Sequence, residues 1–280
     1  MFLDIYLGTV IFIFGLLMGS FYNVCIYRIP EDISIVKPPS HCPYCNHRLS
    51  YLDMIPVLSH LFLKGKCRYC GEKISWRYSL VELLTGAMFL VSYLRLGVNA
   101  ELGFFLVFIS FMIIITFIDI DYRIIPDRFF ISGLILSVAY LFSPLIFKGE
   151  YKGSLFGESV NIQSISDLPV KSALTGALIG GGFLLVVDLI GRLIFKKEGM
   201  GFGDVKLMTW TGLFLGLRGT IVSLLLAVWI GAVAGVILLK IRKNRNEDDK
   251  YMPFGPFLTI GSVIGAFFAQ QIINWYVSMM

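Results

Sequence analysis

Residues 198–212 read EGMGFGDVKLMTWTG and place one acidic residue, Asp204, at the edge of a long apolar sequence. The glycines before it, Gly201 and Gly203 among them, let a backbone adopt positive φ or approach another segment closely. A helical run that begins near Val205 would leave Asp204 at the N-cap or in the first turn. Because Asp is a preferred N-cap residue, capping is the structural alternative to a functional role for this carboxylate.

The composition around this stretch is that of an integral membrane protein. Of the 280 residues, 56% are hydrophobic and 15% charged, and the mean hydropathy is +0.77, far from the balance of a soluble domain. Apolar stretches of about twenty residues can cross about 30 Å of hydrocarbon as helices. The sequence therefore predicts an all-α polytopic membrane protein of about eight transmembrane helices, at 5–26, 79–94, 103–118, 129–147, 172–195, 205–217, 220–239 and 253–277.

The distribution of cations predicts the orientation of these helices. If the first helix runs inward, all but five of the 24 Lys and Arg residues fall on one side, the five being Arg95, Lys148, Lys152, Lys171 and Arg218. By the positive-inside rule the cation-rich side is the cytoplasm, and both termini lie outside. The net charge of +5 then reports topology and not a nucleic-acid partner. Both acidic clusters fall on the cytoplasmic face.

A polar insert separates the first two predicted helices and contains four of the five cysteines. We expect residues 1–26 to form the first helix, 27–78 the insert and 79–280 the membrane-embedded domain. The two CxxC pairs have nearly the spacing of a zinc ribbon and predict a closed structural zinc site, with the ligands Cys42, Cys45, Cys67 and Cys70. Paired disulfides and a redox CxxC remain alternatives, although disulfides are rare in the cytoplasm. The spare candidate ligands are His41, His47 and His60.

A second acidic cluster, IDIDYRIIPD at 118–127, ends another apolar segment with Asp119, Asp121 and Asp127. Ionisable groups at membrane depth are costly and suggest function, although each of these could instead end or cap a helix. Two carboxylates about 3 Å apart share one proton, because like charges so close cannot both ionise. The ionised member can take a proton from water while the protonated member donates to a carbonyl oxygen. Such a pair hydrolyses a peptide, and no serine, cysteine or zinc peptidase motif competes with it.

Taken together, these strings resemble the type IV prepilin peptidases, which are GxGD aspartic proteases of the membrane. The resemblance covers nearly the whole chain and rests on GSFYNVCIYRIP at 19–30, SHCPYC at 40–45, GKCRYCGEKISWRYSLVE at 65–82, IDIDYRIIPD at 118–127, EGMGFGDVKL at 198–207 and PFGPFLTIG at 253–261. It implies that Asp119 and Asp204 are the catalytic pair. We expect supporting roles for Gly201, Gly203, Asp121, Asp127 and Lys206, with Asp121 facing away from the pair because it lies two residues from Asp119.

The resemblance also implies the substrates and a second activity. The enzyme would remove the leader of prepilins or pseudopilins at the inner face of the bacterial cytoplasmic membrane, and then methylate the new amino terminus with S-adenosylmethionine. No glycine-rich Rossmann-type unit is visible, so a methylation site would have to be built from the insert and the neighbouring helix ends, where Glu82 is a candidate.

Two rivals from other classes remain. A polytopic transporter with a zinc-bearing regulatory insert would use the carboxylates as proton relays, and it predicts acidic residues near mid-membrane. An assembly scaffold that holds pilus components through the insert leaves the GFGD string unexplained. The expected partners are prepilins and the lipid bilayer, without nucleic acid.

Overall fold

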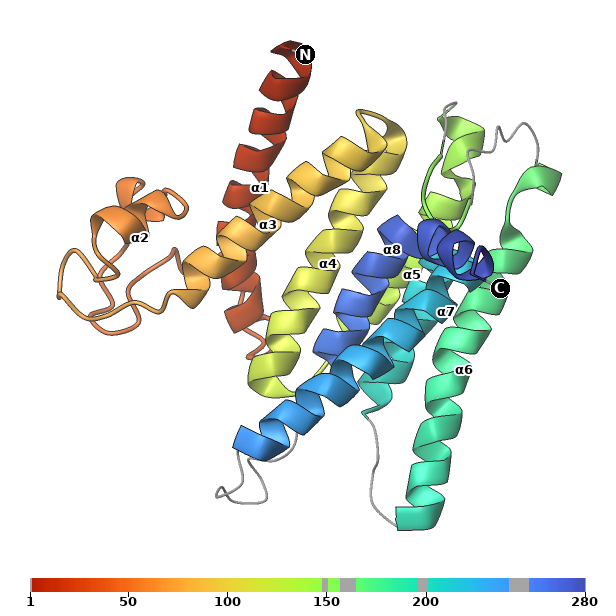
Figure 1. Cartoon of the computed structure of the whole chain (residues 1–280). Coiled ribbons are helices and arrows are strands. Elements are labelled where there is room, and N and C mark those ends of the chain that lie inside the picture. Colours follow the sequence, from red (N-terminus) through yellow and green to blue (C-terminus); the bar gives the residue numbers. More distant parts are fainter. Residues whose placement is uncertain (1, 148–150, 157–164, 196–200, 242–251, 280) are drawn as a thin grey trace. The chain divides into compact units, whose positions relative to one another are not determined.

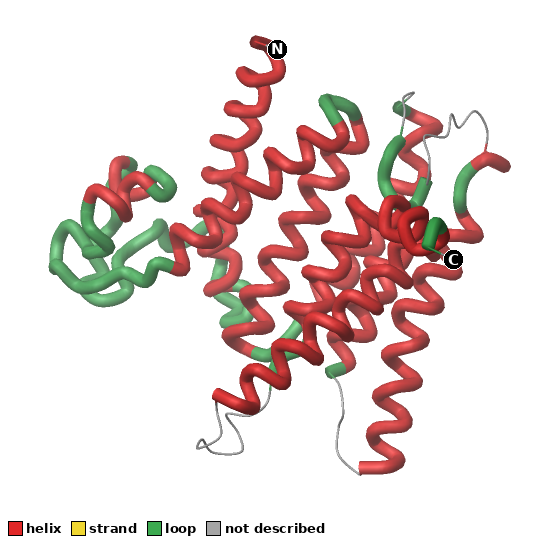
Figure 2. Tube along the Cα trace, viewed as in Figure 1, coloured by secondary structure: helices red, strands yellow, loops and turns green. Residues whose placement is uncertain are grey.

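The chain folds almost entirely into helices (Figure 1). The computed structural model describes residues 2–147, 151–156, 165–195, 201–241 and 252–279, so the first three residues of the EGMGFGDVKL string and residues 148–150 and 157–164 lie outside the described residues. Within those ranges there are helices, loops and two isolated bridges but no strand (Figure 2). Seven of the described helices are long and apolar enough to cross a membrane, which confirms the prediction of an all-α polytopic membrane protein.

The chain divides into two compact units, residues 1–98 and 99–280. The first contains α1 (Phe2–Arg28), the insert with η1 (Leu52–Met54) and α2 (Leu58–Phe62), and α3 (Arg77–Leu96). The second contains α4 (Ala100–Tyr122), α5 (Asp127–Ile146), η2 (Ile165–Asp167), α6 (Val170–Phe195), α7 (Phe202–Ile241) and α8 (Gly255–Val277).

In the first unit, α1 and α3 pack through small residues. A Cβ atom added at Gly15 would lie 2.8 Å from the Cα of Gly86, and one added at Gly19 would lie 2.6 Å from the Cα of Glu82. Such close backbone approach is a main source of helix association in lipid, where the hydrophobic effect between helices is weak. The Asn23 side chain also donates a hydrogen bond of 3.0 Å to the carbonyl oxygen of Tyr78. The insert is therefore attached to a tightly packed helix pair.

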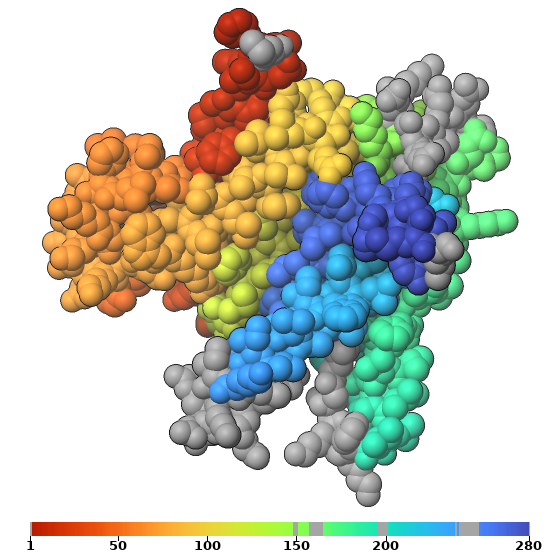
Figure 3. Space-filling view, in the orientation of Figure 1, coloured from red at the N-terminus to blue at the C-terminus, as the bar shows by residue number. Residues whose placement is uncertain are grey.

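In the second unit, α7 folds back on itself at Gly216. This residue has φ 68° and ψ −178°, and a Cβ atom added at Gly180 of α6 would contact both Met208 and Thr220. In a straight helix those two residues would be about 18 Å apart. The predicted segments 205–217 and 220–239 correspond to the two halves of α7. The second half packs against α8, as the two blue shades in Figure 3 show, and Gly261 of α8 meets the backbone of Ser223.

Two serines from neighbouring segments form hydrogen bonds with backbone groups at the reversal in α7. The Leu217 amide donates to Oγ of Ser172 at 3.1 Å, and the Ser154 hydroxyl donates to the carbonyl oxygen of Leu215 at 2.9 Å. Buried backbone groups that a break releases from a helix need such partners. A Cβ at Gly216 would lie 2.6 Å from Oγ of Ser172, so positive φ and close packing both require glycine there.

One buried carboxylate in this unit was not singled out by the sequence. Glu101, in the first turn of α4, is 1% exposed and accepts hydrogen bonds of 2.7 Å from the Tyr140 hydroxyl, 2.8 Å from the Lys152 amide and 2.7 Å from the Gly153 amide. These donors satisfy the buried carboxyl group. Glu101 therefore fixes residues 151–156 against α4 and α5 through these hydrogen bonds.

Candidate active site

The two predicted catalytic aspartates occupy helix ends in the second unit. Asp119 lies in the last turn of α4, and Arg123, the residue that follows the helix, adopts the left-handed conformation with φ 57°. Asp204 lies in the first turn of α7, where its amide donates to the carbonyl oxygen of Gly201 at 3.0 Å. Both side chains are buried, with 6% and 8% of their surface exposed. Each helix therefore presents a carboxyl group at its end and not in mid-membrane.

The chain around these two ends brings them together. A Cβ atom added at Gly203 would lie 3.0 Å from the Cβ of Ile125, so the segment after α4 lies directly against the first turn of α7. The Lys206 ammonium donates a hydrogen bond of 2.5 Å to the Asp127 carboxylate across the same junction. The carboxyl groups of Asp119 and Asp204 are close enough for the charge on one to act on the other. The sequence suggested that these glycines allow either positive φ or close approach to another segment, and Gly203 allows close approach.

The amino end of α8 completes the surroundings of Asp119. The Gly255 amide donates a hydrogen bond to the Asp119 carboxyl group, and a Cβ atom at this position would overlap Oδ2 of the same group. A helix amino terminus also favours a nearby negative charge. Oδ2 itself is buried and has no hydrogen-bond partner among the described residues. A buried oxygen left in this state calls for an explanation, and a catalytic role is one of the few available.

The other predicted site residues lie around this pair and not in it. Asp121 is exposed, as expected for a residue two positions along the helix from Asp119. The Asp127 side chain is 72% exposed and forms an ion pair with Lys206, whose ammonium also lies 5.1 Å from the centre of the Phe202 ring. Gly255 was missed as a site residue, and the only signal in the sequence was its place in the PFGPFLTIG string.

In the first unit, the four insert cysteines come together as predicted. Their Sγ atoms all lie within 4.8 Å of one another, and the Sγ atoms of Cys42 and Cys70 are 3.9 Å apart. Four thiolates about 2.3 Å from a zinc ion would be separated by about 3.8 Å. The four cysteines therefore fit a tetrahedral metal site, and none of the three histidines belongs to the cluster.

The two halves of the cysteine cluster have the same local structure. The Cys42 amide donates to the carbonyl oxygen of His47 at 3.0 Å, and the Cys67 amide donates to that of Glu72 at 2.8 Å. Each turn needs a residue with positive φ, supplied by Asn46 at 56° and Gly71 at 75°. Hydrogen bonds from the backbone amides of Cys70 and Tyr69 lower the pKa of the Cys67 thiol to about 7, whereas the pKa of the Cys70 thiol, despite a hydrogen bond from the Glu72 amide, is raised to about 12 by burial and the neighbouring thiols. Opposite shifts of this kind are expected of thiols close enough to share a proton.

Asp53 links the two cysteine turns. Its carboxylate accepts hydrogen bonds of 2.7 Å from the Ser50 hydroxyl, 2.6 Å from the Arg68 guanidinium and 3.1 Å from the Tyr69 hydroxyl. Burial raises the pKa of Asp53, but these donors outweigh it and hold the pKa at about 2. The carboxylate thus stays charged at neutral pH and connects the segment after the first turn to the second turn.

Comparison with known proteins gives matches to both units. The profile of the bacterial peptidase A24 N-terminal domain matches residues 13–96, and that of the type IV leader peptidase family matches residues 106–236. The prepilin leader peptidase/N-methyltransferase of Bacillus subtilis (strain 168) is 35% identical over 272 residues, covering 97% of this chain and 98% of the relative.

Two further relatives carry the same name. The protein of Aeromonas salmonicida (strain A449) is 33% identical over 295 residues, covering 96% of this chain and 94% of the relative. The protein of Myxococcus xanthus (strain DK1622) is 38% identical over 255 residues, covering 89% and 70%. No solved structure matches significantly.

Proposed function

Because this chain belongs to the type IV leader peptidase family, we propose that it is a membrane aspartic endopeptidase that removes the leader of prepilins or pseudopilins and then methylates the new amino terminus. The observation that carries the proposal is the pair of buried carboxyl groups at the ends of α4 and α7, one of which keeps an unsatisfied buried oxygen. Incubating the purified protein with a prepilin and measuring the product mass tests both activities, because leader loss and methyl addition are resolved separately.

The carboxyl pair supplies the chemistry of cleavage. One of Asp119 and Asp204 is ionised and takes a proton from a water molecule held between them, while the other donates its proton to the oxygen of the scissile carbonyl. The water oxygen bonds to the carbonyl carbon and gives a gem-diol. The carbon–nitrogen bond then breaks as the first aspartate returns a proton to the leaving amine and the second aspartate takes back the proton from a diol hydroxyl. Gly255 positions Asp119 through its amide, and the Lys206–Asp127 pair holds α7 against the segment after α4.

The cysteine cluster would hold a structural zinc ion. Four thiolates leave no open coordination position, so the ion would shape the insert and not activate water. For the second activity, S-adenosylmethionine would supply the methyl group for the neutral amine of the new amino terminus. Cleavage and methylation therefore depend on different parts of the chain, the carboxyl pair in the second unit and the insert in the first.

The transporter rival fits the buried acids less well. A proton relay across the membrane needs ionisable groups near its middle, whereas the two buried carboxylates of α4, Glu101 and Asp119, lie near its opposite ends, about 27 Å apart along the helix. Glu101 is also fully engaged by hydrogen-bond donors. This distribution favours one reaction centre at one end of the second unit.

We expect this reaction centre to face the cytoplasm, as the positive-inside count predicts. Lys64 in the insert and Lys152 after α5 are both exposed, so cysteines placed there report on the two sides of the membrane. In a background without other cysteines, a membrane-impermeant thiol reagent applied to intact cells should label Lys152→Cys and not Lys64→Cys. Labelling of Lys64→Cys from outside would show that the predicted topology is reversed. Removing the four insert cysteines does not disturb the test, because topology is set when the helices insert and needs no zinc.

Gly255→Ala should reduce cleavage by about a hundredfold while the protein still inserts, because the added methyl group overlaps Oδ2 of Asp119 and a small misplacement of a catalytic group is that costly. Gly103→Ala is the matched control: it lies on the same helix as Asp119 and has no atom within 4 Å of an added Cβ. Initial cleavage rates in detergent measure the effect. Equal rates for the two variants would show that Gly255 does not position the pair.

A further inference from the structure

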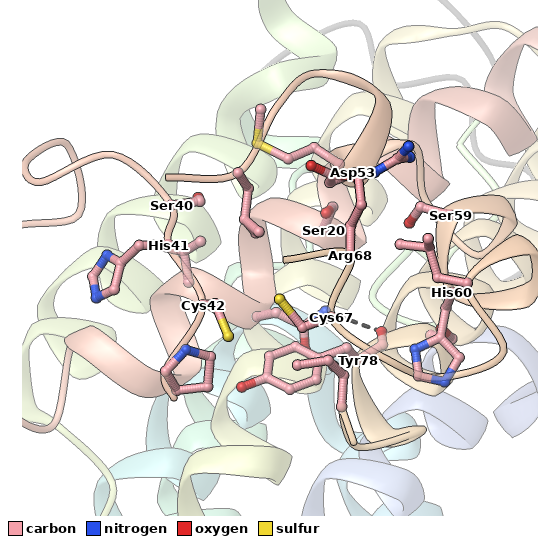
Figure 4. Close-up of a pocket in the computed structure, with 18 of the residues that line it drawn as sticks. Ser20, Ser40, His41, Cys42, Asp53, Ser59, His60, Cys67, Arg68 and Tyr78 are labelled. Atoms are coloured by element: carbon pink, nitrogen blue, oxygen red, sulfur yellow. Dashed lines mark hydrogen bonds and ion pairs between the residues drawn. The ribbon is translucent and has the colours of Figure 1, made fainter. Parts of the chain in front are cut away.

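The first unit contains a cavity, whereas the two aspartates of the candidate active site belong to the second unit. The cavity has a volume of about 410 Å³ and is lined by α1, the insert and the start of α3. Figure 4 shows Ser20 of α1, His60 and Cys67 of the insert, and Tyr78 of α3 around this space. Sites for small molecules and cofactors have volumes of about 300–1,000 Å³. The cavity is therefore large enough for a small-molecule ligand.

A buried carboxylate in the cavity wall indicates the charge of that ligand. Glu82 lines the cavity and is 8% exposed. Its Oε2 atom accepts a hydrogen bond of 2.7 Å from the Val57 amide, which fixes its orientation, but it forms no ion pair within the described part of the chain. A buried charge without a counter-ion is costly. A positively charged ligand would remove that cost.

Two further groups in the wall also lack partners. Nε2 of His60 and Oγ of Ser79 are buried and make no hydrogen bond within the described residues, and these residues are 8% and 5% exposed. Both atoms are covered inside the wall, with Nε2 of His60 packed against Gly65, so a ligand would reach them only after a side-chain movement. The Arg28 side chain, 6% exposed, lines the same cavity and adds a positive charge for a ligand carboxylate.

We propose that this cavity is the binding site for S-adenosylmethionine and that Glu82 is the counter-ion to its positive charge. The inference rests on the proposed function and locates its second activity. The ligand combines the charges that the wall calls for: a sulfonium and an ammonium for Glu82, and a carboxylate for Arg28. The rings of Tyr27 and Tyr78, which also line the cavity, provide apolar surface for the purine.

The methyl transfer needs only the ligand and the new terminal amine. The lone pair of the new terminal amine forms a bond to the methyl carbon as the carbon–sulfur bond breaks. The electron pair of that bond stays on sulfur and leaves the neutral thioether S-adenosylhomocysteine. The positive charge moves to nitrogen, and the methylated amine then loses one proton to water.

Equilibrium dialysis of S-adenosylmethionine against the purified full chain tests the site without relying on activity. The wild type should bind, and Glu82→Gln should weaken binding by about tenfold or more, the scale of one charge-assisted contact. The glutamine carbonyl can still accept from the Val57 amide, so the fold should survive, and the zinc content of each preparation checks it. Glu31→Gln, at an exposed carboxylate just after α1, is the matched control and should bind like the wild type.

Two further measurements test whether S-adenosylmethionine binds in this cavity. Ser79→Leu should abolish binding by filling the cavity, and S-adenosylmethionine added to the wild type should slow hydrogen exchange at residues 57–63 and 77–82. Unchanged binding by Glu82→Gln and Ser79→Leu with zinc retained, or no binding by the wild type, would overturn the assignment. A wild type that still cuts and methylates a prepilin would then leave the proposed function standing, whereas a wild type that does neither would remove it.

Discussion

Asp119→Asn and Asp204→Asn should each reduce leader cleavage by about a thousandfold or more while the protein still inserts into the membrane. Each substitution removes one member of a pair that acts as a unit, since one carboxyl group must accept a proton while the other donates one. The double variant should be no slower than either single variant, because residues that act together do not contribute additively. Quantitative cleavage of a purified prepilin measures all three.

The neighbouring aspartates provide the controls for this experiment. Asp121→Asn changes an exposed residue on the same helix turn as Asp119 and should cost little. Asp127→Asn removes the ion pair with Lys206 and should have an intermediate effect, because an exposed pair is worth only about 1 kcal/mol. Processing at the wild-type rate by either Asp119→Asn or Asp204→Asn would sink the assignment of the catalytic pair.

Much of the fold could be predicted from hydropathy, because a lipid-exposed helix needs a long apolar run. The segments predicted at 103–118 and 172–195 became α4 and α6 with slightly longer bounds. The reversal in α7 was also visible as two adjacent apolar segments. Its position at Gly216 was not, because the break depends on Ser172 and Ser154 from other elements. Hydrogen bonds between distant segments leave no periodic signal in a sequence.

The residues of the two candidate sites also divide into those that the sequence predicts and those that only the structure reveals. The cysteine cluster was predictable because ligand spacing along the chain is itself the signal, and the two aspartates stood out as charges beside apolar runs. Gly255 did not, since its role comes from the lack of a Cβ atom next to Asp119. The cavity beside Glu82 was equally hidden. It forms where α1, the insert and the start of α3 pack together, and no spacing along the chain reports that packing.

The double variant Cys42→Ser with Cys45→Ser should lower bound zinc from about one ion per chain to near zero, and it should reduce methyl transfer far more than cleavage. Both cysteines belong to the four-cysteine cluster, and Cys42 also lines the cavity, whereas Asp119 and Asp204 belong to the other compact unit. Elemental analysis of protein kept reduced gives the zinc content. Cys25→Ser, at a buried cysteine of α1 outside the cluster, should retain the ion.

A reciprocal variant distinguishes two separate sites from general misfolding. Asp204→Asn should methylate a pilin that has already been cut, while failing to cut the precursor, because we propose that the carboxyl pair serves cleavage alone. Misfolding of the cysteine variant would lower both activities together, so only opposite patterns in the two variants support separate sites. If the cysteine variant lost cleavage completely and kept methylation, the insert would have to serve the peptidase reaction, and the cavity beside Glu82 would lose its assigned role.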